Sequence, residues 1–168
     1  MGSAPSLEGG CSCGAVRYTL TRAPMFTHCC HCLDCQKQTG GAFAINALVE
    51  AAHLPLTQGA PERITMPTES GRPHDIYLCP QCKVALWSDY GRRGTLFFLR
   101  VSTLDTPHAI APDVHIFTRS KVPWVNLSGP LPNGSATGKP ALVVDVYYDT
   151  EKEWPAESLA RRTALTKT

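Results

Sequence analysis

The chain has 168 residues, of which 43% are hydrophobic and 18% charged, and its formal net charge is +2. This length predicts a single domain with enough chain to bury a real core. The scattered basic residues argue against a nucleic-acid partner, and no stretch approaches the roughly 18 consecutive apolar residues of a membrane span. The 14 prolines and 13 glycines favour many short elements and a mainly β fold with little helix.

Apolar and alternating runs predict short strands from one end of the chain to the other. The predicted strands are residues 16–20, 42–49, 75–78, 84–87, 96–101, 114–117 and 142–148. Helix is expected only as a turn over 33–38 and as a segment over 155–165, where Pro155 suits the first helical position. The Pro- and Gly-rich residues 126–140 predict one long irregular loop. There is no internal repeat and no sign of a second domain.

The eight cysteines are the most informative residues, because almost all of them fall into tight groups. The groups are Cys11-x-Cys13, Cys30-x-Cys32-x-x-Cys35 with Cys29 just before it, and Cys79-x-x-Cys82. A set of disulfides is the alternative interpretation. However, no signal-peptide pattern opens the sequence, so we expect a cytoplasmic, thiol-reducing location and metal binding rather than disulfides.

A C-x-C pair supplies two ligands, and a C-x-x-C pair supplies the two more that a tetrahedral ion needs. Cys11, Cys13, Cys79 and Cys82, here called the outer cysteine set, are therefore predicted to hold a structural zinc ion. An ion shared by these four cysteines would join the start of the chain to its middle and should stabilise the fold.

Cys30, Cys32 and Cys35, here called the central cysteine set, then remain as three thiolates on one short loop. Zinc with three protein ligands keeps an open position, which is typical of catalytic sites. The alternative is a closed structural site whose fourth ligand is Cys29, His28 or His31. Adjacency argues against Cys29, which we expect to be a small buried apolar residue.

Several blocks of the sequence resemble the family of glutathione-dependent formaldehyde-activating enzymes, which also includes centromere protein V. The resemblance rests on the segments 9–18, 30–40, 79–82, 112–117 and 120–124, which contain all three cysteine motifs in the family's order and spacing. It implies a family domain over residues 8–133, after a flexible start at 1–7 and before a C-terminal extension at 134–168.

The resemblance implies a single-domain β-tent fold with two zinc ions per chain, a structural one in the outer set and a catalytic one in the central set. It also implies carbon–sulfur lyase chemistry, in which glutathione adds to formaldehyde to give S-hydroxymethylglutathione. The alternative is a non-catalytic zinc scaffold that binds a protein or nucleic-acid partner. The open three-cysteine site favours the enzyme, with a small-molecule thiol and a small aldehyde as substrates.

Outside the cysteines, basic residues are candidates to pair with the carboxylates of a glutathione-like ligand; they are Arg17, Lys37, Arg100, Arg119 and Lys121. His31 and Asp34 lie inside the central loop. They are candidates to carry protons or to hydrogen-bond to the metal ligands, and the alternative is that they are solvated loop residues. We expect the remaining notable side chains, Trp87, Phe97, Phe98, Trp124 and His115, to be structural.

Overall fold

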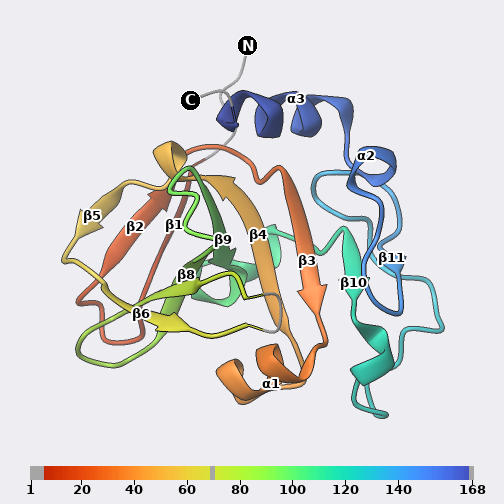
Figure 1. Ribbon diagram of the computed structural model, residues 1–168, viewed down its shortest axis with the longest axis horizontal. Coiled ribbons are helices and arrows are strands. Elements are labelled where there is room, and N and C mark those ends of the chain that lie inside the picture. The colour runs from red at the N-terminus through yellow and green to blue at the C-terminus, as the bar shows by residue number, and fades with distance from the viewer. Residues whose placement is uncertain (1–5, 69–70, 167–168) are drawn as a thin grey trace. The chain divides into compact units, whose positions relative to one another are not determined.

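The computed structural model describes residues 6–68 and 71–166 (Figure 1). It confirms the predicted mainly β fold, with two sheets and few helical residues. The chain forms two compact units: residues up to 23 together with 48–107, and residues 24–47 together with those from 108 onward. We call them the first and second unit.

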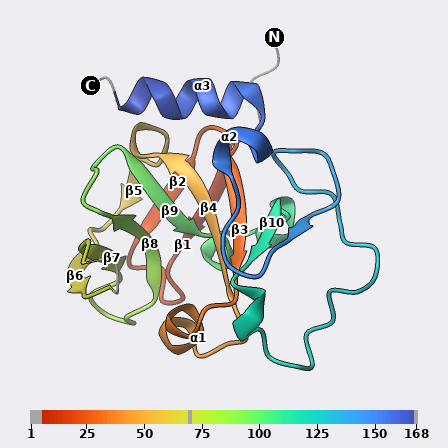
Figure 2. The same cartoon turned by 45° about the vertical axis from the view of Figure 1, so that its right-hand side comes forward.

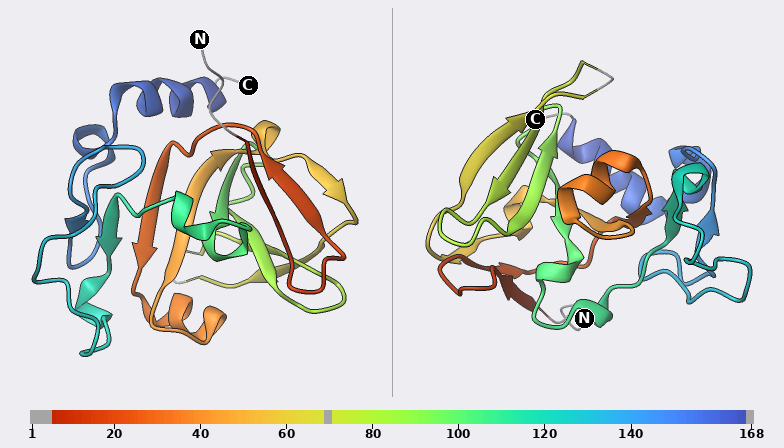
Figure 3. Two further views of the ribbon diagram at one scale, coloured as in Figure 1. Left: turned by 180° about the vertical axis from the view of Figure 1, so that it is seen from behind. Right: turned by 90° about the horizontal axis from the view of Figure 1, so that it is seen from below.

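The first unit contains a three-stranded antiparallel sheet of β1 (Leu7–Gly10), β2 (Arg17–Leu20) and β5 (Leu56–Gln58), in the order β1-β2-β5 (Figure 3, left). Gly9 pairs with Tyr18 in this sheet, and a Cβ on Gly9 would lie 2.5 Å from the Tyr18 ring. Glycine is therefore needed at this position, because the buried ring occupies the space of a side chain. The Tyr18 hydroxyl also lies 2.7 Å from Thr103 Oγ1.

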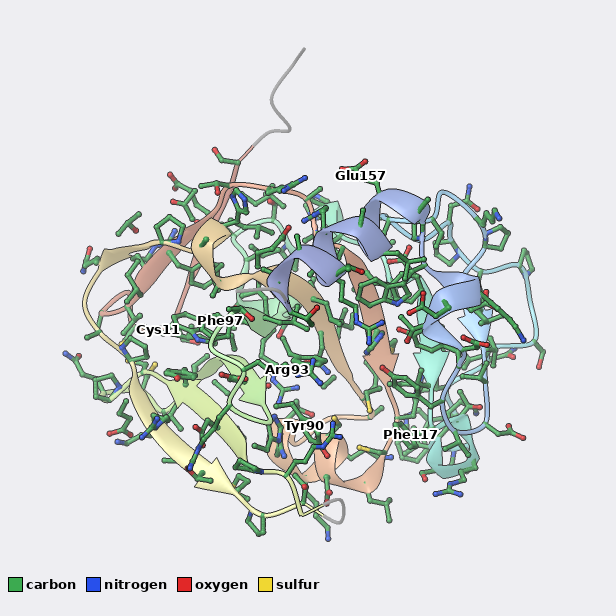
Figure 4. The ribbon with its side chains drawn as sticks, turned by 45° about the horizontal axis from the view of Figure 1, so that its top comes forward. Cys11, Tyr90, Arg93, Phe97, Phe117 and Glu157 are labelled. Carbon is green, nitrogen blue, oxygen red and sulfur yellow. The ribbon has the colours of Figure 1, made fainter. Side chains whose placement is uncertain are left out.

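The first unit also contains four antiparallel strands, β6 (Glu62–Met66), β7 (His74–Leu78), β8 (Ala85–Tyr90) and β9 (Leu96–Arg100), followed in strand order by the end of β4. Trp87 is buried as predicted and stacks on Tyr77 and on Phe97, which is labelled in Figure 4. The predicted strands at 75–78, 84–87 and 96–101 are confirmed, and the hairpin of β7 and β8 carries the third cysteine group at its turn.

In the second unit, β10 (Val114–Ile116) lies parallel to β3 (Phe26–Cys30) (Figure 2) and to β11 (Leu142–Val143), which is labelled in Figure 1. β3 is next to the first half of β4 (Ala44–Glu50) in strand order. The sequence pattern did not predict β3. All five of its residues are buried, and Thr27 and His28 interrupt the apolar run, so neither alternation nor continuous hydrophobicity marks the strand.

Helices are few, as predicted: α1 (Leu33–Thr39), α2 (Thr150–Glu153) and α3 (Ala156–Leu165). Short 3₁₀ turns cover Ala51–His53, Val101–Thr103, Pro107–Ala109 and Thr118–Ser120. Pro155 is the residue before α3 rather than its first helical residue. No helix in the described ranges is long and apolar enough to cross a membrane.

Two structural predictions for the C-terminal part are wrong. The strand predicted over 142–148 ends at Val143, because the backbone beyond it bonds instead to the turn at residues 117–119, with Thr118 N–H donating to the Val144 carbonyl. Trp124 is 78% exposed and does not belong to the core. Residues 126–140 form the irregular segment that their prolines and glycines predicted.

A buried carboxylate fixes the start of β10. Asp113 accepts hydrogen bonds from the backbone N–H groups of Thr27, Ala136 and Thr137, at 2.8, 2.9 and 2.9 Å, and from the Thr137 hydroxyl at 3.1 Å. Gly134 lies so close that a Cβ there would be 2.2 Å from the carboxylate. Asp113 thus joins β3, β10 and the segment after residue 133.

Candidate metal centres

The structure brings the four sulfurs of the outer cysteine set together in the first unit. All four lie within 4.8 Å of one another, with Cys13 Sγ at 3.5 Å from Cys11 Sγ and 3.7 Å from Cys79 Sγ. A disulfide requires about 2.05 Å between sulfurs, whereas two thiolates on a tetrahedral zinc ion, each at about 2.3 Å from it, lie about 3.8 Å apart. The spacing therefore fits a tetrahedral ion, and the four thiols are free.

Two similar turns present these sulfurs. In the first, Cys11 N–H donates to the Val16 carbonyl and Val16 N–H donates to Cys11 Sγ at 3.2 Å. In the second, Cys79 N–H donates to the Val84 carbonyl, and Lys83 takes a positive φ of 60° to close the turn. Backbone N–H groups directed at sulfur stabilise the thiolate form, which is the form that binds a metal.

The central cysteine set lies in the second unit, where β3 ends and α1 begins (Figure 1). The three sulfurs of Cys30, Cys32 and Cys35 lie within 4.8 Å of one another; the first is buried and the other two are half-buried. Cys32 is the N-cap of α1, and its Sγ accepts a hydrogen bond from Cys35 N–H at 3.4 Å. Local helix geometry alone therefore directs two of the three sulfurs to one point.

A glutamine side chain holds the loop that carries these sulfurs. Gln36 Nε2 donates to the His31 carbonyl at 2.8 Å and to the Ser120 carbonyl at 2.9 Å, so it ties α1 to the central loop and to the turn after β10. Gly40 ends α1 in the left-handed conformation, with φ of 65°. The sulfurs are therefore positioned by contacts on both sides of the loop.

The three thiols of the central set do not ionise independently. Hydrogen bonds from the Cys30 and Cys35 thiols, together with the Cys35 N–H, lower the pKa of Cys32 to about 2. The pKa of Cys30 is raised, because its thiol is hydrogen-bonded to Cys32 and Cys35 and is buried. The Cys32 thiolate thus forms readily while the Cys30 thiol keeps its proton, and a cation would favour the ionised form of both.

The residues considered as a fourth ligand point elsewhere. His28 Nε2 lies 2.6 Å from the Tyr148 hydroxyl, and His31 Nε2 lies 3.6 Å from Cys29 Sγ and 3.0 Å from His115 Nδ1. Cys29 is buried, as predicted. Across the described ranges, no histidine, carboxylate or further cysteine joins Cys30, Cys32 and Cys35 in one group. The donor set therefore fits a zinc ion with one position left for another ligand.

The basic residues proposed for a carboxylate ligand have different surroundings. In the first unit, Arg17 forms an ion pair with Asp105, and Arg100 is buried. In the second unit, Lys121 Nζ donates to the Val125 carbonyl at 2.6 Å, whereas Lys37 and Arg119 are exposed. Asp34 is also exposed, in the first turn of α1. Lys37 and Arg119 are the basic candidates most accessible to a ligand.

His115 was expected to be structural, and nothing in the sequence connected it with Cys29 and His31. The parallel pairing between residues 28–30 and 114–116 would have revealed this connection. It could not be predicted because β3 itself was not predicted. The structure groups Cys29, His31 and His115 as a third set of potential ligands, here called the Cys–His cluster.

Comparisons with known proteins agree with the cysteine pattern. Residues 6–120 match the family described as glutathione-dependent formaldehyde-activating enzyme. A protein of Halomonas elongata, which bears that enzyme name provisionally, is 30% identical over 132 residues, covering 72% of this chain and 80% of the relative. A crystal structure of a Rhodobacter sphaeroides protein has a TM-score of 0.44 and 18% identity, over 59% of this chain and 88% of that one, which is too distant to support an argument. The chain belongs to the family of glutathione-dependent formaldehyde-activating enzymes.

Proposed function

We propose that this protein is a zinc-dependent carbon–sulfur lyase that joins glutathione and formaldehyde to give S-hydroxymethylglutathione. In the reaction, the thiol sulfur forms a bond to the carbonyl carbon and the carbonyl π bond breaks. The proton that leaves the thiol ends on the former carbonyl oxygen, so the atoms balance without a further reactant. Membership of the family and the central cysteine set both support this proposal.

The outer set supports a structural role, and the central set a catalytic one. Cys11, Cys13, Cys79 and Cys82 offer four sulfurs, which close a tetrahedral site. Cys30, Cys32 and Cys35 would hold the catalytic zinc ion, which when bound lowers the pKa of a coordinating thiol and polarises a carbonyl. The observation that carries the proposal is this difference between four ligands and three.

The chain's own residues prepare the site for a thiol substrate. The shared N-cap geometry of Cys32 and Cys35, and the Gln36 bridge, fix three sulfurs before any substrate arrives. Leu33, in the first turn of α1, is 60% exposed and leaves an accessible apolar side chain next to the ligands. The exposed Lys37 and Arg119 would attract the carboxylates of glutathione.

The test compares Cys32→Ser with Cys13→Ser, one variant in each cysteine set. Metal content is measured by elemental analysis, and the rate of adduct formation is measured by NMR exchange between ¹³C-formaldehyde and glutathione above the uncatalysed rate. We expect Cys32→Ser to lose one zinc equivalent and to abolish the acceleration. An unchanged acceleration in Cys32→Ser would refute the proposal. Cys13→Ser is the control in the structural set: if this variant remains folded, it should keep part of the acceleration.

A further inference from the structure

The parallel pairing of β3 and β10 places three potential metal ligands on one face of the sheet. Cys29 is directly opposite His115 in the register, and paired residues on neighbouring strands direct their side chains to the same face. His31 follows Cys29 by two residues, and its N–H donates to the Ile116 carbonyl at 3.0 Å, which continues the pairing past the end of β3. Strand alternation directs Cys30 to the opposite face, so the Cys–His cluster is separate from the central cysteine set.

The three donor atoms of the cluster have the spacing of ligands on one ion. His31 Nε2 lies 3.0 Å from His115 Nδ1 and 3.6 Å from Cys29 Sγ, and all three atoms lie within 4.8 Å of one another. In a tetrahedral zinc site, Zn–N bonds of about 2.0–2.1 Å and Zn–S bonds of about 2.3 Å put two nitrogens about 3.3 Å apart and a nitrogen and a sulfur about 3.6 Å apart. The observed spacing agrees within a few tenths of an ångström.

Hydrogen bonding alone leaves this cluster poorly satisfied. His31 Nε2 carries at most one proton, yet it is the near neighbour of both Cys29 Sγ and His115 Nδ1. His31 is fully buried, and its other nitrogen, Nδ1, has no hydrogen-bond partner within the described part of the chain. A metal ion at the point where the three atoms converge would bind Nε2 together with both of its neighbours, and Nδ1 would then carry the ring proton.

We infer that Cys29, His31 and His115 form a third metal site, which binds one zinc ion or a similar borderline divalent transition-metal ion. One thiolate and two imidazoles are the donors that such ions prefer, whereas magnesium and calcium prefer oxygen. Cys29 and His31 are buried and His115 is half-buried, so the open position and the route of entry lie on the side of His115.

The site differs from both cysteine sets in charge. It offers a single thiolate against the positive charges of the ion, whereas the central set offers three and the outer set four. Fewer negative ligands bind a dication more weakly, so the third ion is expected to bind last and to be lost first to a chelator. Because Cys30 lies between Cys29 and His31, an ion here would also hold the backbone of the catalytic loop.

The test is a metal titration of the full chain with zinc, read by elemental analysis after removal of unbound ion. We expect three equivalents in the wild type and two in Cys29→Ala and in His115→Ala. His108→Ala changes an exposed histidine of the same unit and should keep all three. Only two equivalents in the wild type, or a third that survives both Cys29→Ala and His115→Ala, would overturn the inference.

A second measurement keeps the inference testable if either variant folds poorly. X-ray absorption of the wild type before and after brief chelation should show the loss of all imidazole nitrogen ligands, with one sulfur lost for every two nitrogens, because the cysteine sets contribute only sulfur. Loss of sulfur ligands alone would contradict the third site. Neither readout depends on catalysis, so an inactive protein with three ions would refute the proposed function and leave this inference standing.

Discussion

Replacing Asp113 should destabilise the second unit by an amount that depends on how many of its hydrogen bonds survive. In Asp113→Ala, three backbone N–H groups lose their acceptor, those of Thr27, Ala136 and Thr137. Each buried donor without a partner costs about 1–3 kcal/mol. With partial relaxation, we expect a loss of about 3–6 kcal/mol, a large fraction of the roughly 5–15 kcal/mol that stabilises a typical domain.

Asp113→Asn should cost much less. Its amide oxygen can take the place of Oδ1, which accepts from Ala136 and Thr137, so that only the bond from Thr27 at Oδ2 is lost. We expect a loss of about 1–3 kcal/mol, and less than about 1 kcal/mol for the exposed control Asp145→Asn.

Equilibrium urea unfolding with saturating zinc measures all three variants. The reasoning would be refuted if Asp113→Ala and Asp113→Asn lost the same stability, or if both lost less than about 1 kcal/mol. If Asp113→Ala does not fold, the comparison of Asp113→Asn with the control still decides the question.

Three further predictions follow from the contacts. Tyr148→Phe removes the hydroxyl that contacts His28 Nε2 and accepts from Trp154 Nε1 at 2.8 Å, so we expect a loss of about 2 kcal/mol in urea unfolding, and no loss would contradict the assigned bonds. The hydrogen bond from Arg92 lowers the pKa of Asp75. The pair therefore stabilises the fold fully at pH values above the ordinary carboxyl pKa of about 3.9. This stabilisation is lost as the pH falls through the lowered pKa of Asp75 in the folded protein. Asp75→Asn should therefore be less stable than the wild type at pH 7, with a difference that shrinks below pH 4; a constant difference would contradict the assignment. Since thiols must lose protons to bind zinc, zinc retention against a fixed chelator should fall as the pH is lowered, and a retention independent of pH would exclude thiolate ligands.

The structure groups the cysteines as the sequence indicated, because much of the geometry of each motif is local, and their role as zinc ligands stays a prediction. A C-x-C or C-x-x-C turn directs its two sulfurs to one side whatever the rest of the fold, and the order of the pairs along the chain left few ways to combine them. The same locality explains why α1 and the strands β7 and β8 were predicted. Each of these features is determined by residues close together in the sequence, whereas the meeting of Cys13 with Cys79 depends on the fold.

Features that depend on distant partners were not predictable in this way. β3 carries polar residues whose partners come from far along the chain, such as the Tyr148 hydroxyl beside His28. The strand predicted over 142–148 ends at Val143 because the backbone beyond it bonds to the turn near Thr118. The Cys–His cluster depends on a parallel register, which no local pattern encodes.

The central claim is that the central cysteine set holds an ion with a position open to a thiol. X-ray absorption at the zinc edge, with and without glutathione, tests this most directly. Cys29→Ala is the appropriate background, because it limits zinc to the two cysteine sets. The account predicts one additional sulfur ligand per chain when glutathione binds, and loss of this change in Cys32→Ser. An unchanged number of sulfur ligands at saturating glutathione would contradict it.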